Sequence, residues 1–525
     1  MTLEEFVRKN READVRALAL HMRQYPEMDA AFALQQIEGW QKARQKLPEL
    51  AAIDGWLWPK RVSVEQSSSQ ATALYKKAVL EKWKMENGKW KIGGQRLVDL
   101  TGGMGVDCYY LSEGFEEVHY VERDEELCRL AEKNFALAGK KVQVHHCSAE
   151  EWLKVLTSQA QTIGRAVQGY REDTTIFVDP ARRDKNGGKV FRLEDCEPNV
   201  VELLSILRAC ARRVLMKLSP MLDITAAVRS LGGAAEVHVV AVKNEVKEVL
   251  VLIEGARDKE QRARTGADVQ GNSMDPEITC VNLETEEEAF VFRKSEETLA
   301  MGLSPSEGKR WNYSLEPSLC SPPRPSLAAP SCTDCRPATL KHSGQTALPI
   351  RNSVSSGGPE DGGTVPKNNS SAIASTSSIE GLMEERDVIL VEPNGAIMKA
   401  GGWTCFGAKY GLEELGPNSH LFCVPGDPRC MQESPKAVRR IYGYFCGKAG
   451  AEKLLPGRIF RVKIASKEEL KTLNQANVIC RNYPMSADAL KKKLRVRDGG
   501  EKYVIATQIG SKPVLFLGVR QFLHN

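Results

Sequence analysis

The first 85 residues carry apolar side chains at helical spacing. Apolar residues recur every three or four positions in the segments EEFVRKNREADVRALALHMRQY (residues 4–25) and AAFALQQIEGWQKARQKL (residues 30–47). This period is typical of amphipathic helices that bury one face. The pattern therefore predicts a helical N-terminal region over residues 1–85.

Between residues 86 and 255 short apolar, β-branched runs alternate with helical stretches. The runs are RLVDLTG, EVHYVER, VQVHHC, TTIFVDP, RVLMKLSP, EVHVVAV and KEVLVLIE. Alternating strands and helices predict crossover connections and a mainly parallel sheet. Only KNEV separates the last two runs, which is too short for a crossover helix, so we expect an antiparallel hairpin there. The result is an α/β, Rossmann-like sheet of seven strands whose last strand is antiparallel.

The pattern breaks down from about residue 304 to residue 379. This stretch is rich in Ser, Pro and Gly and poor in apolar residues, so it cannot bury enough surface to offset its ordering entropy. We predict a disordered insert within one α+β domain of residues 275–430, because apolar runs flank it. Four strand-like runs and the helical SADALKKKL predict a second α+β module over residues 455–525.

Composition places the chain among globular proteins. It has 525 residues, 42% apolar and 27% charged, with no apolar run of membrane-spanning length. The N-terminal segment is charged from its fourth residue, which is unlike a secretory signal. We therefore expect a cytoplasmic protein with reduced cysteines. Cys332 and Cys335 form a CxxC without a matching second pair, so we predict no metal site.

Charge separates the C-terminal module from the rest. Residues 457–525 hold 14 Lys/Arg and 5 Asp/Glu, a net charge of +9, although the whole chain carries +5. A basic module on an acidic body is typical of polyanion binding, although a solvated basic surface would look the same.

The stretch DLTGGMGVD (residues 99–107) lies between the first predicted strand and a predicted helix. Gly102, Gly103 and Gly105 would let the backbone approach a ligand closely. The following helix N-terminus offers free N–H groups, and ligands of open α/β sheets bind at this edge.

The surrounding residues narrow the choice of ligand. The third glycine of a dinucleotide fingerprint is missing, and so is the Gly-Lys-Ser/Thr of a P-loop. S-adenosylmethionine, with its cationic sulfonium, needs acids as well as glycines. Asp99 ends the first strand, where it would face the cation and amino group. Glu122 ends the second strand, where it can accept both ribose hydroxyls, and Ser148 follows the third, near the adenine.

A second site is expected after the fourth strand, at Asp179-Pro180-Ala181-Arg182-Arg183. Pro180 would hold the turn rigid, and Asp179 would accept a proton or hydrogen bond from the methyl acceptor. Arg182 and Arg183 could hold phosphate, or pair with nearby acids. No cysteine nucleophile follows strands four and five, which argues against methylation of a pyrimidine carbon.

Two acceptor atoms stay open. For a base nitrogen, Asp179 and Pro180 would align an amine of a flipped or unpaired base. For a ribose hydroxyl, a lysine of lowered pKa would be needed. Lys217, Glu248 and Lys76 are spaced like part of the Lys-Asp-Lys-Glu set of ribose methyltransferases.

The chain resembles class I S-adenosylmethionine-dependent methyltransferases that carry a THUMP-like C-terminal domain. The resemblance rests on VEQSSSQATALYKKA, VDLTGGMGVD, YVERDEELCRLAEKNF, VDPARRD, LEDCEPNV, MKLSPMLDI, NEVKEVL, EPNGAIMKAGG and NVICRNYPMSADALKKKLRVRDGGEKYVIATQI. It covers nearly the whole chain outside the insert. The chain departs from the family pattern at two positions. It has Ser148 where the family pattern would have Asp, and Val246 where the family pattern would have Cys.

The resemblance implies a ferredoxin-like domain around residues 275–430, a THUMP-like domain after about residue 455, and an RNA substrate, tRNA or rRNA. It implies that Gln66 and Ser67 close over the methionine end, although a helix cap would explain them equally. The expected RNA contacts of the basic module are Lys491, Lys492, Lys493 and Arg495. Direct transfer is expected, with Lys217 stabilising or activating the acceptor.

Two other functions stay open, the first of them in a different class. One is a non-catalytic RNA-binding protein that keeps a methyltransferase fold. The other is a small-molecule methyltransferase, which would make no use of the basic module.

Overall fold

The computed structural model describes residues 1–86, 89–90, 96–162, 174–181, 192–255, 272–301, 388–416, 418–423, 455–510 and 512–521. Arg182, Arg183, the two cysteines of the CxxC and the predicted disordered insert lie outside these residues. No helix in the described part of the chain is long and apolar enough to cross a membrane.

The N-terminal region is helical, as the periodicity predicts. Thr2 and Glu5 form a capping box that begins the first helix, which satisfies N–H groups that have no partner inside the helix. The helices are α1 (Leu3–Asn10), α2 (Val15–His21), α3 (Ala30–Lys46), α4 (Pro48–Ala51), α5 (Arg61–Gln66) and α6 (Gln70–Lys84), with the turn η1 (Met22–Gln24) after α2 and the short strands β1 (Met85–Glu86) and β2 (Lys89–Trp90) after α6.

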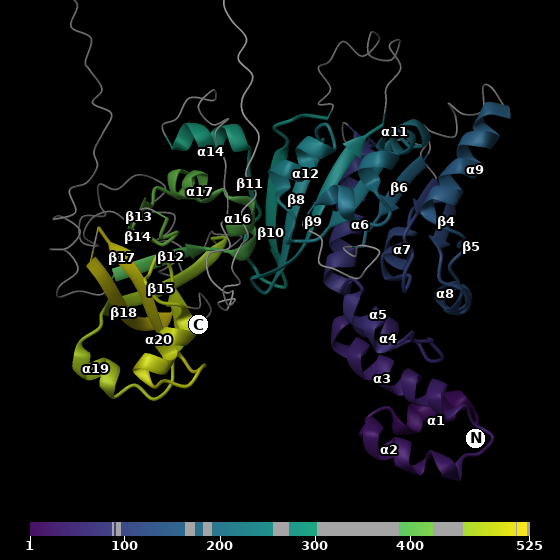
Figure 1. Cartoon of the computed structure of the whole chain (residues 1–525), viewed down its shortest axis with the longest axis horizontal. Helices are drawn as coiled ribbons and strands as arrows, with labels where there is room; N and C mark the ends of the chain where they lie inside the picture. The colour runs from purple at the N-terminus through teal and green to yellow at the C-terminus, as the bar shows by residue number, and fades with distance from the viewer. Residues whose placement is uncertain are drawn as a thin grey trace, which may run out of the picture.

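A nine-stranded sheet forms the centre of the molecule (Figure 1). In spatial order its strands are β11 (Phe290–Phe292), β10 (Glu277–Leu283), β8 (Glu236–Val242), β9 (Glu245–Glu254), β7 (Arg213–Leu218), β6 (Thr174–Val178), β3 (Arg96–Asp99), β4 (Glu117–Glu122) and β5 (Gln143–His146). The intervening helices are α7 (Val106–Leu111), α8 (Glu125–Leu137), α9 (Ala149–Thr162), α11 (Val200–Cys210) and α12 (Ile224–Ser230), with the turn η2 (Leu193–Asp195) before α11.

Both faces of this sheet are buried, which explains the nearly continuous apolar runs. Val214 and Met216 of β7 pack into one core cluster, and Leu215 between them packs into the other. The second cluster includes Val79 and Leu80 of α6. The N-terminal region is therefore joined to the sheet through α6.

The seven predicted strands all form, and β8 and β9 make the predicted hairpin. Lys243 and Asn244, the two residues between these strands, both have positive φ, as a tight two-residue hairpin requires. The antiparallel strand does not end the sheet. Instead β9 lies between β7 and β8, and β8 runs parallel to β10 beyond it.

The region predicted as one unit over residues 275–430 is divided between two sheets. Strands β10 and β11 extend the large sheet by two strands. The remainder contributes to a seven-stranded sheet in the order β13 (Glu413–Glu414), β14 (Phe422–Cys423), β12 (Val388–Pro393), β15 (Gly457–Ile464), β18 (Lys512–Arg520), β17 (Lys502–Ile509) and β16 (Asn477–Cys480). The helices of this half are α14 (Lys294–Ala300), α16 (Gly395–Ala400), α17 (Trp403–Tyr410), α19 (Lys467–Lys471) and α20 (Ala487–Leu494).

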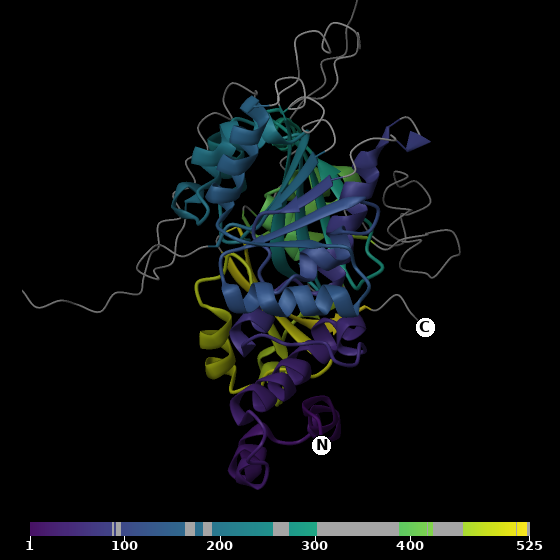
Figure 2. The same ribbon diagram turned by 90° about the vertical axis from the view of Figure 1, so that its right-hand side faces the viewer.

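The two halves have separate sheets but share a hydrophobic core. Ile397 of α16 and Phe406 of α17 belong to the same core cluster as the large sheet. In both views the N-terminal helices and the C-terminal sheet extend from the same end of the molecule (Figures 1 and 2).

Candidate cofactor and acceptor site

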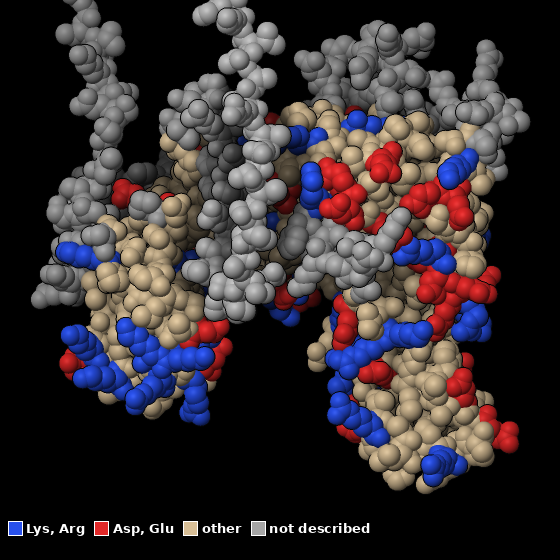
Figure 3. Space-filling model, viewed as in Figure 1, with Lys and Arg blue, Asp and Glu red and all other residues tan. Residues whose placement is uncertain are grey.

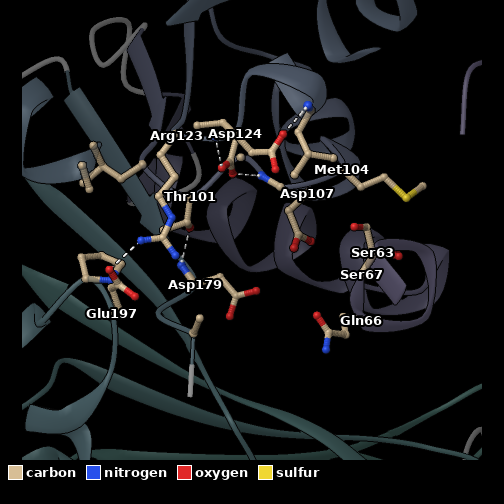
Figure 4. A pocket seen from close by; sticks show the side chains of 18 of the residues that line it. Ser63, Gln66, Ser67, Thr101, Met104, Asp107, Arg123, Asp124, Asp179 and Glu197 are labelled. Atoms are coloured by element: carbon tan, nitrogen blue, oxygen red, sulfur yellow. Dashed lines mark hydrogen bonds and ion pairs between the residues drawn. The ribbon is translucent and has the colours of Figure 1, made fainter. Parts of the chain in front are cut away.

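A cavity of about 660 Å³ opens at the carboxyl ends of the central strands. Its walls come from the end of α5 and the loop after it, the β3–α7 turn, the ends of β4 and β5, and the segments that follow β6 and precede α11 (Figure 4). This volume is within the range of cavities that hold drug-sized ligands. The predicted turn and the predicted acceptor segment thus meet in one cavity.

Glycine is needed at the three positions of the turn for different structural reasons. A Cβ on Gly102 would lie 2.1 Å from the ring of Tyr120, and one on Gly105, at φ +83°, would lie 3.0 Å from the ring of Phe135. Gly103, at φ +54°, has only one backbone atom within 4 Å of its Cβ direction. Gly102 and Gly103 line the cavity, whereas Gly105 does not. Close packing of the turn on aromatic rings therefore explains two of the glycines, and Gly103 is the one left open toward a ligand.

Glu122 lies at the cavity and orients the turn. Its Oε2 accepts a hydrogen bond from the backbone N–H of Gly103 at 2.8 Å, and its Oε1 accepts one from the N–H of Asp124 at 2.9 Å. A carboxylate held by two backbone donors has a fixed position. The predicted glutamate and the predicted glycine turn are thus joined directly.

Asp99 is placed differently from its predicted role. Its side chain is completely buried and does not line the cavity. Oδ1 accepts a hydrogen bond from the N–H of Thr101, and Oδ2 has no hydrogen-bond partner in the described structure. Burial raises the pKa of Asp99 well above its usual value. The structure therefore puts this acid behind the cavity wall, not facing a cation.

Gln66, Ser67 and Ser148 all line the cavity. The sequence left open that Gln66 and Ser67 cap a helix. The serine that caps α6 is instead Ser69, whose Oγ accepts a hydrogen bond from the N–H of Thr72. Ser148 caps α9, because its Oγ accepts from the N–H of Glu151 and its own N–H donates to that carboxylate.

On the acceptor side, Asp179 and Lys217 form an ion pair and both line the cavity. The N–H of Asp179 donates to Thr101 Oγ1 at 2.7 Å, which ties this segment to the glycine turn. Pro180 is buried and is not among the lining residues, so it supports the turn from behind.

The charge state of Lys217 follows from its neighbours. Burial would lower the pKa of Lys217, but the carboxylates of Asp179, Asp107 and Glu248 together raise it above the usual value. Lys217 therefore stays protonated at neutral pH and cannot accept a proton. Lys76 and Glu248, from the ribose-methyltransferase pattern, pair with each other at 2.7 Å but do not line the cavity.

Sequence reasoning missed several lining residues. Asp107 is the last residue of the glycine-turn motif, and Arg123 directly follows Glu122, so their positions in the sequence were the available signal. Arg123 pairs with Glu197 at 2.5 Å, across the space between the predicted cofactor and acceptor segments (Figure 4). That pairing joins positions 74 residues apart, and no local pattern predicts it.

The basic residues of α20 are not equivalent. Lys491 is partly buried and pairs with Asp498 at 2.8 Å. Lys492, Lys493 and Arg495 are exposed and form no ion pair with the described residues. Lys and Arg side chains gather at this end of the C-terminal sheet (Figure 3).

Comparisons with known proteins agree with this geometry. The model of a THUMP domain-like family matches residues 457–520, and that of a ferredoxin-like domain matches residues 390–425. A crystal structure of a Porphyromonas gingivalis W83 protein assigned as a methyltransferase has a TM-score of 0.62 and 25% identity, over 99% of this chain and 98% of that one. This is the fold of a class I methyltransferase.

Curated relatives support S-adenosylmethionine as the cofactor of this methyltransferase fold. An uncharacterised S-adenosylmethionine-dependent methyltransferase from two strains of Mycobacterium tuberculosis is 27% identical over 165 residues. The match covers 31% of this chain and 40% of the relative. The chain thus spans less than half the length of these relatives.

Proposed function

We propose that this protein is a cytoplasmic S-adenosylmethionine-dependent methyltransferase that methylates a base nitrogen of RNA, tRNA or rRNA, by direct transfer. The observation that carries the proposal is the single cavity in which Glu122 and Gly103 lie at one part and Asp179 with Lys217 at another. A methyl donor and an acceptor can meet only if their sites adjoin.

The residues of the cavity fit the cofactor. Glu122 presents a fixed carboxylate to the ribose hydroxyls, Ser148 and Leu127 line the part beyond it, and Gln66 and Ser67 line the part before the glycine turn. When bound, S-adenosylmethionine supplies an electrophilic methyl group on a sulfonium. The chain's own task is to orient it and to exclude competing nucleophiles.

A base nitrogen is the acceptor that the charges favour. Asp179 can accept a hydrogen bond from an N–H of the acceptor base and later its proton, while protonated Lys217 pairs with Asp179 and holds its carboxylate in place. A ribose hydroxyl would need a neutral lysine as base. Lys217 is charged, and Lys76 does not reach the cavity.

Direct transfer is supported by the state of the lining cysteine. Cys147 lines the cavity beside Ser148, and burial raises the pKa of its thiol. A thiol of raised pKa is a poor nucleophile. We therefore assign no covalent intermediate on cysteine.

RNA is proposed as the substrate because of the C-terminal module. Its net charge of +9 and the exposed Lys492, Lys493 and Arg495 suit contacts to a phosphate backbone. The THUMP-like match is consistent with this role. We propose that Arg182 and Arg183 help to hold the acceptor nucleotide.

Comparing nucleosides by mass spectrometry from cells with and without the gene tests the proposal. We expect one methylated base to disappear from tRNA or rRNA and to return with the wild-type gene but not with an Asp179→Ala gene. A methylated ribose, or unchanged RNA together with methylation of a small molecule, would contradict the proposal.

A further inference from the structure

Asp107 is a buried carboxylate in the cavity wall, and it has no role in the methyl transfer proposed above. It lies in the first turn of α7, and its side chain is 10% exposed. Figure 4 shows Asp107, Asp179 and Gln66 directed into the same space. The hydroxyl of Ser68 donates a hydrogen bond to Oδ2 at 2.7 Å. The contact that the described structure gives Oδ1 is the ammonium of Lys76, at 3.2 Å.

The charges behind Asp107 keep it ionised. Lys76, which is completely buried, lies 3.2 Å from Oδ1, but both oxygens of Glu248 contact the same ammonium at 2.7 and 2.8 Å. Burial alone would raise the pKa of Asp107, yet Lys76, Lys217 and the Ser68 hydroxyl together lower it. Lys76 is therefore shared between two carboxylates and does not neutralise Asp107 by itself.

Lysines are shared among the acids of this cluster. The ion pairs join three carboxylates, Asp107, Asp179 and Glu248, to two ammonium groups, those of Lys76 and Lys217. Lys46 also lies within electrostatic range of Asp107 but forms no ion pair with it in the described structure. An oxygen whose one contact is a shared ammonium group keeps lone pairs that can accept hydrogen bonds from a ligand in the cavity. Such a site fits a cation that can donate hydrogen bonds.

The place of Asp107 in the cavity indicates which cation. Glu122 and Ser148 lie on the β4 and β5 side, where the nucleoside is proposed, whereas Asp107 adjoins Ser67 and Ser68 on the α5 side. A sulfonium has no N–H to donate, but an α-ammonium group has three donors. We propose that Asp107 binds the α-ammonium group of the methionine portion of S-adenosylmethionine, with Ser68 and Lys76 as positioning residues. The assignment rests on the proposed cofactor.

Calorimetry with three ligands tests this assignment on the full chain. S-adenosylmethionine and S-adenosylhomocysteine both carry the α-ammonium group, whereas 5′-methylthioadenosine lacks the whole amino-acid portion. For Asp107→Asn we expect the affinity for the first two to fall about 10- to 100-fold, the scale of a hydrogen bond to a charged group, with 5′-methylthioadenosine binding unchanged.

Glu122→Ala is the matched comparison, because it removes a carboxylate on the nucleoside side. Glu122→Ala should lower the affinity for all three ligands by a similar factor. For Asp107→Asn, an equal loss of affinity for all three ligands, or no loss of affinity for any of them, would overturn the assignment. Binding of 5′-methylthioadenosine also reports that the variant is folded.

If Asp107→Asn does not fold, Ser68→Ala provides the second variant. It leaves the charge in place but releases the orientation of Asp107. We expect a smaller loss for the two ligands with an ammonium group, and none for 5′-methylthioadenosine. An equal loss for all three would overturn the assignment. Wild-type protein that binds none of the three would instead contradict the proposed function itself.

Discussion

At the scale of single residues, the site is built from acids whose environments differ strongly. Asp99 is sealed behind the wall, Asp107 is buried but paired with lysine, Glu122 is held by backbone N–H groups, and Asp179 pairs with Lys217. Carboxylic side chains thus supply a sealed group of raised pKa, a charged anchor and a hydrogen-bond acceptor. Neighbouring groups decide which role each acid takes.

Replacing Glu122 tests the nucleoside side. For Glu122→Ala we expect the dissociation constant for S-adenosylmethionine to rise about 10- to 100-fold, because the two proposed hydroxyl contacts and the anchor of the Gly103 N–H would be lost. Isothermal calorimetry measures this. Glu116→Ala, at an exposed position just before the same strand, should leave the constant unchanged. Equal behaviour of the two variants would contradict the role of Glu122.

Replacing Asp179 tests catalysis separately from binding. For Asp179→Ala we expect methyl transfer to fall at least about 100-fold, the scale of a lost proton acceptor, with cofactor affinity nearly unchanged. Transfer of a labelled methyl group to cellular RNA measures the rate. Asp195→Ala, at an exposed position, should keep full activity. Full turnover in Asp179→Ala would show that the catalytic assignment is wrong.

Asp99 gives a pH-dependent prediction. Its pKa is raised in the folded protein, so the folded state binds the proton more tightly than the unfolded state. The stability that this proton supplies is present at low pH and is lost as pH rises through the folded pKa. Each unit by which the pKa is raised corresponds to about 1.4 kcal/mol.

Asp99→Asn should remove that loss, because its side chain cannot ionise. We expect the variant to gain stability relative to wild type as pH rises from about 4 toward neutrality. Denaturant unfolding of both proteins without cofactor, at several pH values, measures the difference. A difference that does not change with pH would contradict a raised pKa.

At the scale of elements, the β3–α7 turn depends on how tightly it packs on the next strand. Tyr120 of β4 lies under Gly102, and its hydroxyl donates a hydrogen bond to the carbonyl of Gly103 at 2.5 Å. The turn is therefore fixed by the strand that also provides Glu122. A change in packing there should affect both stability and the cofactor site.

Gly102→Ala tests this packing. A methyl group 2.1 Å from a buried ring forces the ring or the turn to move, so we expect a loss of about 2–3 kcal/mol in unfolding free energy. Gly139→Ala is the control, since that site has positive φ but no atom within 4 Å, and the backbone strain alone should cost about 1 kcal/mol. Thermal or denaturant unfolding compares them. A smaller loss in Gly102→Ala than in the control would contradict this interpretation.

At the scale of the whole molecule, the C-terminal module cannot be treated as a detachable unit. Strand β12 of the ferredoxin-like segment pairs with β15 of the THUMP-like domain over six residue pairs. Deleting the C-terminal domain would expose the edge of β12. A loss of activity could then come either from the missing RNA contacts or from damage to the rest of the fold. Charge variants on its surface avoid this problem.

Replacing Lys492, Lys493 and Arg495 with Glu tests the RNA role. We expect weaker RNA binding on all RNA sequences and a salt dependence of affinity that is shallower by about one unit of log–log slope per lost phosphate contact. Filter binding or fluorescence titration at several salt concentrations measures both. Arg8, Lys9 and Arg23, also exposed, give a matched charge change when replaced with Glu, and that variant should bind RNA nearly as wild type.

The α20 variant, in which Lys492, Lys493 and Arg495 are replaced with Glu, should keep the cofactor affinity of the wild type, because these three residues lie outside the cavity. Unchanged RNA binding in the α20 variant would remove the support for RNA as substrate. Continued methylation of a small molecule in that variant would instead favour a small-molecule methyltransferase.

Local features of the sequence predicted the elements and the main parts of the site. Strand runs, helical periodicity and the two-residue hairpin are short-range signals, so the seven strands and the helical N-terminal region could be predicted. Glu122, Gly103 and Asp179 could also be predicted to meet, because the ends of neighbouring parallel strands share one edge of the sheet.

Contacts between distant segments decided the rest. Lys76 and Glu248 are 172 residues apart, yet together they set the charge beside Asp107. The burial of Asp99, the ring beneath Gly102 and the pairing of β12 with β15 likewise depend on what packs against each residue. Periodicity along the chain indicates which side chains are buried and where strands end. It does not contain the partner of a buried charge, because that partner is chosen only when the elements pack together.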